Sequence, residues 1–598
     1  MKPFRGHGRA CTKPDSRFPQ GRGQHAGGAQ PQRRTSAQEG EQRFGRERQR
    51  PNRSQAQGEK HPRFGQPQQR PARQIEQKNP HPHAWQPQRR PTRGHAREAQ
   101  PSFSQKSFAH QPEAIDLHRI ARKAMEKYGF DAVFPPQVER EVNALSDRVS
   151  AREGKGMRDM RHLLWSSIDN YDTEDLDQIE YCEAGANGEI HVKVGIADVD
   201  AYVPKGSAAD GHAKRNTTSV YTGIQTFPML PDRLSKGLSS LPMGQDRLAV
   251  ISEFAVLPNG VVRQGGIYRA LVRNKGKLVY EQVAEWLEGT GPMPKGIAGV
   301  EGLEEQVWLQ DKAAQRLENY RMGQGALELE SLEARAVIKD DRVLGLAVVQ
   351  ENRAMHIIEN FMIAANGVMS GFLEKRNIPS IHRVVREPKD WAGIRMLAKG
   401  KGYALPSTPS AKALSLFLAG RKEADPQSFP DLSLAIVKMI GAGEYVLHDR
   451  ERPIGHFCLA VTHYTHGTAP NRRYVDLIIQ RLIKAALEGA PTPYGKSELS
   501  EDAGWCTDRE MAAKRVERFM VKAEAATLLE GKIGEEFDAI VTGASEKGNY
   551  ARLLEPPVEG RIVRIARHAK GIRVGQKVRV RLVNLDPREG YVDFEMIG

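Results

Sequence analysis

The order of apolar and polar positions divides the chain into segments of different kinds. Between about residues 160 and 490, strand patterns and helix patterns follow one another. Residues 190–196 alternate, with isoleucine or valine at every second position, which predicts a strand. Residues 353–374 carry apolar side chains on most sides of a helix, and residues 476–488 predict a further helix. Because a helix that is apolar nearly all round is buried in a large core, this stretch should fold as one α+β domain.

The segment before this domain is predicted to be a small helical lead-in. Order should begin near Ile115, because the apolar residues that follow have helical spacing. The run Phe134-Pro135-Pro136 should end this first helix, since proline does not continue a helix, and a second short helix should follow.

After the domain the pattern changes twice. Thr507-Asp508-Arg509-Glu510 has the form of a capping box, which predicts a connecting helix from there to about Glu530, where Gly531 can end it. Beyond Gly531, about five short strand patterns separated by Gly, Pro and Asn predict a small barrel of the OB type. Segment 577–582 alternates basic and apolar residues, so one of its faces should enter the barrel core and the other should be basic.

The positive charge of the chain is concentrated in one tail. The chain holds 89 Lys and Arg against 74 Asp and Glu, a net charge of +15. Residues 1–110 contain 23 basic and 7 acidic residues, or +16, which leaves 66 basic and 67 acidic residues for the remainder. This tail has almost no aliphatic residues, so it should be disordered. Its charge suits loose contacts with RNA or with a protein, and a solubilising tail without a partner is the alternative.

The cysteines and the apolar runs argue against several classes of protein. Cys11, Cys182, Cys458 and Cys506 are far apart and form no Cys-x-x-Cys pair, so the sequence indicates neither a zinc site nor a disulfide framework. No apolar run approaches the roughly 20 residues that span a bilayer, and the N-terminus lacks the apolar core of a secretory signal. We therefore expect a cytoplasmic protein that does not enter a membrane.

The acidic run between residues 169 and 177 is the main candidate for chemistry. On an extended chain, Asp175 and Asp177 point to one face and Leu176 to the other, and Asp169 can turn back to join them. Three converging carboxylates repel one another unless they hold a cation, and hard oxygen ligands favour Mg²⁺ or Mn²⁺. Spacing alone leaves an acidic surface loop equally open. The apolar residues on both sides favour a site at the edge of a core.

Several separate motifs, in the same order along the chain, resemble those of the ribonuclease II / ribonuclease R family, the RNB exoribonucleases. The resemblance covers roughly residues 160–598 and rests on the following segments: Ile168-Asp169, Glu174-Asp175-Leu176-Asp177, Ile196-Ala197-Asp198-Val199, Phe227-Pro228-Met229-Leu230-Pro231, Lys277-Leu278-Val279-Tyr280, Glu359 with Met362-Ile363-Ala364-Ala365-Asn366, and Thr468-Ala469-Pro470-Asn471-Arg472-Arg473-Tyr474. It implies a processive 3′→5′ exoribonuclease that binds single-stranded RNA in a channel and releases nucleoside 5′-monophosphates. No nucleotide cofactor is implied, and we expect a monomer.

The resemblance also implies roles for individual residues. Asp169, Asp175, Asp177 and Gln178 would hold Mg²⁺, or Mn²⁺ in its place, and Asp175, Asp177 and Arg472 would be catalytic. An arginine at the scissile phosphate can donate two hydrogen bonds to developing charge. The expected RNA contacts are Tyr221, Tyr280, Glu359, Arg473, Tyr550 and Arg579. Core positions are the alternative for the first two tyrosines. His463 and His466 are expected to form structural hydrogen bonds rather than to bind a metal.

One departure from the family pattern bears on activity. Gln178 stands where the family commonly has a further Asp, which removes one negative charge from the site. A second hypothesis is therefore an RNA-binding regulator that uses the same channel with weakened catalysis, and a third is an endonuclease. Retention of Asp169, Asp175, Asp177 and Arg472 favours the exonuclease.

The sequence thus predicts an α+β protein in five parts. They are a disordered basic tail (1–110), a helical lead-in (111–160), an RNB catalytic domain of mixed sheet and helices (161–506), a connecting helix (507–530) and an OB-fold RNA-binding barrel (531–598).

Overall fold

The computed structural model describes residues 115–147, 156–330, 333–339, 342–545, 548–565 and 572–597. The chain divides into two compact units, 1–106 and 107–598, and every described residue belongs to the second unit. The basic tail and Cys11 lie outside the described residues, so the disorder expected for the tail stays a prediction.

Two helices precede the central sheet, as predicted for the lead-in: α1 (Leu117–Lys127) and α2 (Pro136–Asn143). The carboxylate of Asp116 caps α1 by accepting a hydrogen bond from the N–H of Arg119 over 2.9 Å. The predicted end of this helix was wrong, because α1 already stops before Gly129, whose φ is 78°. Pro136 begins α2 instead, since the first turn of a helix needs no proline N–H.

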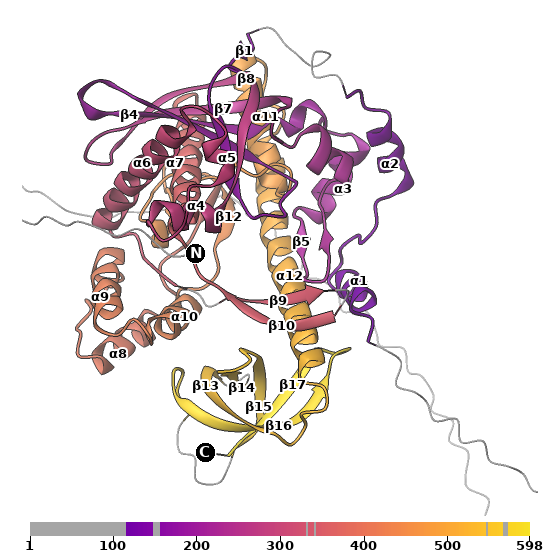
Figure 1. Ribbon diagram of the computed structural model, residues 1–598, viewed down its shortest axis with the longest axis vertical. Coiled ribbons are helices and arrows are strands. Elements are labelled where there is room, and N and C mark those ends of the chain that lie inside the picture. Colours follow the sequence, from indigo (N-terminus) through magenta and orange to yellow (C-terminus); the bar gives the residue numbers. More distant parts are fainter. Residues whose placement is uncertain are drawn as a thin grey trace, which may run out of the picture. The chain divides into compact units, whose positions relative to one another are not determined.

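A six-stranded mixed sheet forms the centre of this unit (Figure 1). Its strands, in spatial order, are β1 (Arg158–Asp159), β8 (Val262–Val279), β2 (Trp165–Asp169), β3 (Gln178–Ala184), β4 (Ile190–Ala197) and β7 (Asp246–Val256). Strand β4 confirms the predicted alternation and pairs antiparallel with β3 and β7. Strand β2 runs parallel to β8, so that Asp169 lies opposite Val279 and the two strands end at the same edge.

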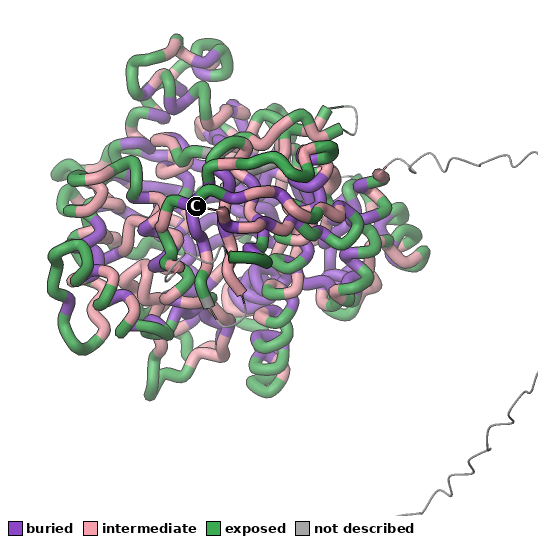
Figure 2. Tube along the Cα trace, turned by 90° about the horizontal axis from the view of Figure 1, so that it is seen from below, coloured by how far each residue is buried: buried purple, intermediate pink, exposed green. Residues whose placement is uncertain are grey.

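Helices α6 (Leu303–Gln324) and α7 (Arg353–Lys375) pack against this sheet and against each other (Figure 1). Helix α7 confirms the buried helix predicted over 353–374. Strand β4 is buried along nearly its whole length, because both faces of the sheet are covered. In Figure 2 the buried residues gather inside the fold and the exposed residues lie on the outer turns.

Smaller elements complete the domain. The helices are α3 (Ala208–Asn216), α4 (Tyr280–Leu287), α5 (Lys295–Ala298), α8 (Trp391–Gly400), α9 (Ala411–Ala424) and α10 (Phe429–Ile440). The strand pairs are β5 (Val220–Tyr221) with β6 (Thr226–Phe227), β9 (Glu333–Lys339) with β10 (Arg342–Val349), and β11 (Ile381–Val384) with β12 (Glu444–Leu447). Helices α8, α9 and α10 enclose a separate apolar cluster.

Two long helices follow, α11 (Tyr474–Glu488) and α12 (Lys496–Leu528). The first confirms the predicted helix over 476–488, but the predicted start of the second at Thr507 was wrong. Thr507 lies inside α12, where its hydroxyl donates to the carbonyl of Ala503 over 3.0 Å and accepts from the N–H of Tyr445 over 2.8 Å. The hydroxyl of Thr507 is therefore used in a contact with β12 and does not cap the start of a helix. The predicted boundary at 506/507 falls within one helix that also contacts the barrel.

The C-terminal strands close into a barrel, as predicted. In spatial order they are β13 (Glu536–Ser545), β14 (Gly548–Leu553), β15 (Glu559–Ile565), β17 (Tyr591–Met596) and β16 (Lys577–Asp586). Val578, Val580 and Leu582 enter the barrel core, and the basic residues between them face outward. This confirms the alternation predicted for 577–582.

Candidate active site

The loop between β2 and β3 carries the predicted carboxylates to the edge of the sheet. Asp169 ends β2, and its carboxylate accepts hydrogen bonds from the N–H of Asn170 over 2.8 Å and the hydroxyl of Thr173 over 2.9 Å. The loop is fixed at Leu176, which is buried and bonded through its N–H to the hydroxyl of Ser240 over 3.0 Å. The apolar side chain thus points into the core, which holds its two acidic neighbours at the core edge.

Asp177 and Arg472 form the most direct contact in this site. The guanidinium Nε of Arg472 donates to Oδ2 of Asp177 over 3.1 Å, and the N–H of Asn471 donates to Oδ1 over 3.2 Å. Asp177 is only 3% exposed, whereas 43% of the Arg472 side chain is exposed. Burial raises the pKa of Asp177 to about 7, with Arg472 opposing the rise and Asp175 adding to it. The carboxylate therefore has less positive charge nearby than its ionised form requires.

Asp175 is partly buried beside them, and burial raises its pKa. The positive charge of Arg472 lowers that pKa and the negative charge of Asp169 raises it, so all four groups share one electrostatic environment. Their arrangement is open: among the described residues, these carboxylates do not form a group whose oxygen atoms all lie within 4.8 Å of one another.

Strand β3 contributes two further polar side chains at alternate positions. Gln178 begins the strand and is 7% exposed, and Glu180 is completely buried. Residues two apart in a strand share a face. Within the part of the chain that the structure describes, neither carboxylate oxygen of Glu180 has a hydrogen-bond partner. Burial and the charge of Asp169 raise the pKa of Glu180. Analysis of the sequence missed this residue, although its position on the same strand face as Gln178 was a usable signal.

Tyr221 reaches the site from a short hairpin that is bonded to the arginine loop. The N–H of Ser219 donates to the carbonyl of Arg472 over 3.0 Å, and the N–H of Tyr474 donates to the carbonyl of Thr217 over 2.8 Å. Although 46% of Tyr221 is exposed, the surrounding protein raises its pKa, and the nearby charges of Asp175 and Asp177 contribute in the same direction. Because the charges of Asp175 and Asp177 act on Tyr221, its phenol lies close to these carboxylates. The role predicted for Tyr221 needs this closeness.

Tyr280 approaches Asp169 from the end of β8. It is the first residue of α4 and directly follows Val279, the partner of Asp169 in β8. Its pKa is raised by burial and then by the charges of Asp169 and Glu180. The pairing of β2 with β8 therefore brings Tyr280 to the edge of the sheet where Asp169 lies.

Two predicted RNA contacts are engaged with protein groups instead. Arg473 donates from Nη2 to the buried carboxylate of Asp476 over 2.8 Å. Glu359 is exposed on α7, where its carboxylate lies 3.8 Å from Arg321 and 4.0 Å from His356. Among the described residues, neither side chain is hydrogen-bonded or ion-paired to the carboxylate loop, so their roles with RNA stay predictions.

The two RNA contacts predicted in the barrel, Tyr550 and Arg579, also interact with other side chains of the protein. Arg579 on β16 donates to Glu536 over 3.3 Å and lies 3.7 Å from Asp538, so acidic groups offset much of the predicted basic face. Tyr550 on β14 lies beneath the ammonium group of Lys522, 5.4 Å from its ring centroid. Their contacts with RNA remain predictions.

Two models of known protein families match the chain. The family model of the RNB domain matches residues 157–489, and that of the RNase II-type exonuclease C-terminal S1 domain matches residues 535–597. The chain belongs to the RNB family. Ribonuclease R of Thermotoga maritima is 30% identical to it over 492 residues, a match that covers 78% of this chain and 68% of the relative. The predicted family, and the RNB domain followed by a small barrel, are thereby confirmed.

Solved structures support the same RNB fold. Ribonuclease R of Mycoplasma genitalium, in complex with ribose-methylated single-stranded RNA, superposes with a TM-score of 0.73 at 23% identity, covering 81% of this chain and 78% of that one. Yeast Ssd1, described as a pseudonuclease, superposes with a TM-score of 0.58 at 16% identity, covering 75% and 56%. Proteins with this fold therefore include a ribonuclease and a pseudonuclease. Whether this chain is a nuclease has to be judged from the residues of its site.

No helix in the described part of this RNB chain combines the length and apolar character needed to cross a membrane. A cytoplasmic location and a monomeric state stay predictions.

Proposed function

We propose that this RNB protein is a divalent-metal-dependent exoribonuclease that hydrolyses single-stranded RNA processively from the 3′ end to nucleoside 5′-monophosphates. The observation that carries the proposal is the contact between buried Asp177 and exposed Arg472 beside Asp169 and Asp175. The partly exposed Arg472 side chain uses Nε in its bond to Asp177, so its other donors could face a phosphate beside the carboxylates.

The side chains of the site fit a hard divalent cation, Mg²⁺ or Mn²⁺. Asp177 is buried with a raised pKa although Arg472 is bonded to it, and Glu180 is a buried carboxylate without a hydrogen-bond partner among the described residues. A cation would supply the positive charge that these buried groups need in their ionised form. Asp169, Asp175 and Asp177 would hold the metal, with Gln178 offering a neutral oxygen. The metal would activate water and stabilise charge on the phosphate.

We propose further that Glu180 offsets the charge lost at Gln178. The two residues share a face of β3, and the charge of Asp169 acts on Glu180. The site then has four carboxylates, although one stands two residues from the position expected from the family pattern.

The two tyrosines suit a terminal nucleotide. Tyr221 and Tyr280 approach the carboxylates from different elements, β5 and α4. Aromatic rings stack on bases of any sequence, and a hydroxyl near the last nucleotides can contact a ribose. Such contacts favour a single strand over a duplex end.

An RNA-binding regulator with weakened catalysis is the second candidate function, and Gln178 is the observation that favours it. A regulator would have no need to keep Asp169, Asp175 and Asp177 close together beside Arg472, because the repulsion of converging carboxylates is costly without a cation. The exonuclease is therefore the better supported candidate.

A single assay separates these candidates. The full chain is incubated with a 5′-labelled single-stranded RNA and either Mg²⁺ or Mn²⁺, beside Asp177→Asn, whose amide keeps the size of the side chain. We expect mononucleotides from the natural chain and a rate at least about 1000-fold lower from the variant. Binding without products would identify the regulator. Internal cleavage of a 3′-blocked or circular RNA would identify an endonuclease.

A further inference from the structure

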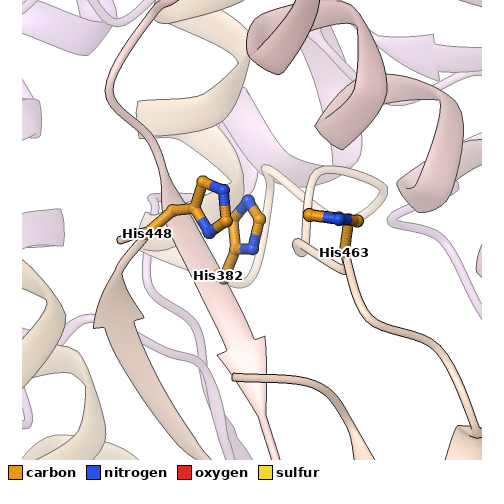
Figure 3. A group of neighbouring side chains, drawn as sticks. All are labelled: His382, His448 and His463. Atoms are coloured by element: carbon orange, nitrogen blue, oxygen red, sulfur yellow. The ribbon is translucent and has the colours of Figure 1, made fainter. Parts of the chain in front are cut away.

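Three histidines from separate parts of the chain meet beside the C-terminal end of α7, away from the carboxylate loop. His382 belongs to β11, His448 directly follows β12, and His463 lies in the segment that leads to Arg472. Figure 3 shows their rings gathered together. Each offers one ring nitrogen, and the three nitrogens lie within 4.8 Å of one another. Of the described residues, no other group of three or more His, Cys, Asp or Glu has this closeness.

Two of the rings are stacked on each other, and the third stands edge-on to both. His382 and His448 are stacked, with centroids 4.0 Å apart and planes 14° apart. His463 presents its edge to both, at 5.4 Å from His448 and 6.2 Å from His382.

Each of the three rings has one nitrogen that makes no hydrogen bond in the described part of the chain. Nδ1 of His382, Nε2 of His448 and Nδ1 of His463 are all buried, and none has a hydrogen-bond partner in the described part of the chain. Buried polar atoms are nearly always satisfied, so three orphaned atoms in one place require an explanation. The other nitrogen of His382, Nε2, lies 3.2 Å from the hydroxyl of Ser370. A proton on that nitrogen leaves the lone pair of Nδ1 free.

A carboxylate lies beside two of the three rings. Oε2 of Glu374 lies 3.4 Å from Nδ1 of His463, and Oε1 lies 3.9 Å from Nε2 of His448, the same two nitrogens that lack a partner. An ordinary His–Glu ion pair would place an N–H in line with an oxygen. Here the carboxylate lies beside both nitrogens without a hydrogen bond to either.

We propose that His382, His448, His463 and Glu374 bind a first-row transition metal ion, with zinc as the natural fit. Imidazole nitrogens and one carboxylate suit Zn²⁺ and favour it over Mg²⁺, which prefers oxygen ligands. Three imidazoles and the neighbouring carboxylate supply four ligands, the number that a closed structural zinc site uses. The charges of Asp449 and Arg450 next to His448 oppose each other.

Such an ion would link four segments of the chain: β11, the residues after β12, the segment around His463, and α7. The N–H of Arg383 already donates to the carbonyl of Tyr464 over 2.8 Å, and the hydroxyl of Thr465 donates to the carbonyl of Ile381 over 2.6 Å. The metal would add a link from this pair of segments to α7 through Glu374. Its role is to stabilise the segment that precedes the Arg472 loop.

Metal binding tests the proposal without reference to nuclease activity. The full chain is stripped of metal and titrated with Zn²⁺ against a chromophoric chelator, with Mg²⁺ in excess. His463→Ala is the main variant, because this partly exposed residue is the ligand whose loss disturbs packing least. His191→Ala is the matched control, since His191 is exposed to a similar extent (34% against 38%) and also lies near a carboxylate, that of Glu189 at 3.8 Å.

We expect about one tightly bound zinc ion per chain in the natural protein and in the control. His463→Ala should bind it at least about 100-fold more weakly, and Ser370→Ala, which keeps all four ligands, about 10-fold to 100-fold more weakly. Other histidines, including those of the tail, are the same in all variants and cannot produce this difference.

Two further measurements complete the test. Cobalt in the natural chain should give the intense visible absorption of a tetrahedral site, and His463→Ala should lose it. A chelator that binds zinc and leaves Mg²⁺ should lower the Tm of the natural chain and leave that of His463→Ala unchanged. Equal zinc affinity in the natural chain and His463→Ala, or an octahedral cobalt spectrum, would overturn the proposal.

Discussion

Arg472 donates a hydrogen bond from Nε to Oδ2 of Asp177 over 3.1 Å across a sequence separation of 295 residues. The contact joins the start of β3 to the turn before α11. It leaves the far side of the guanidinium exposed, because the bond uses Nε and 43% of the side chain remains accessible. One arginine can therefore hold a buried carboxylate and still face a phosphate.

Substitution by lysine should have different effects at the adjacent residues Arg472 and Arg473. Arg472→Lys keeps the charge but loses the planar donor set, so we expect kcat to fall about 100-fold to 1000-fold while Tm changes little. Arg473→Lys should mainly lower Tm, because Arg473 is bonded to the fully buried Asp476. Single-turnover kinetics and thermal unfolding on both variants separate the two effects. Equal losses of kcat in both would contradict the assigned roles.

Glu180 should affect the metal requirement rather than the fold. Glu180→Gln removes a buried charge that has no hydrogen-bond partner in the described residues, so stability should be unchanged or higher. The Mg²⁺ concentration for half-maximal activity should rise about 10-fold or more. Glu183→Gln, further along the same strand and 46% exposed, is the control. The idea fails if both variants titrate with Mg²⁺ like the natural chain.

Glu524 should make stability depend on pH. This residue of α12 is 1% exposed, its carboxylate accepts a hydrogen bond from the N–H of Ile224 over 3.1 Å, and burial raises its pKa from 4.5 to about 7. The folded state therefore binds the proton more tightly than the unfolded state. The resulting stability is fully present below pH 4.5 and is lost as the pH rises through about 7.

Glu524→Gln keeps an oxygen for Ile224 and removes the titration. At pH 8.5 the variant should be more stable than the natural chain by up to about 3 kcal/mol, and the difference should shrink as the pH falls toward 5. Urea unfolding at both pH values measures it. A difference that does not change with pH would show that Glu524 does not titrate in this window.

The parts that the sequence predicted well are those with a local period. The alternation in β4, the apolar sides of α7 and the short strands of the barrel follow directly from side-chain spacing. The start of α12 was mistaken because a capping pattern is local, whereas the hydroxyl of Thr507 is used by a tertiary contact with Tyr445. The family resemblance, rather than spacing, identified Arg472 and Tyr221 as partners of the acidic run.

The histidine cluster shows the limit of reading metal sites from a sequence. His463 and His466 were both expected to form structural hydrogen bonds, and His466 does bond to Tyr445 over 2.9 Å. His463 has no such bond among the described residues. Its companions His382 and His448 belong to distant segments that only the pairing of β11 with β12 brings together. Neither composition nor motif spacing contains that information.

The basic tail, 1–110, should add to RNA affinity through its charge. It holds 23 Lys and Arg against 7 Asp and Glu, while the rest of the chain is nearly neutral. Each phosphate that a tail residue neutralises releases counterions, so affinity should fall steeply with salt in the full chain. Deleting 1–110 should weaken RNA binding at low salt and give a shallower slope of log affinity against log salt. The turnover of RNA already bound should be unchanged, because the carboxylates and Arg472 remain. Fluorescence anisotropy at several salt concentrations makes the comparison, and identical slopes for both proteins would rule out a role for the tail in RNA attraction.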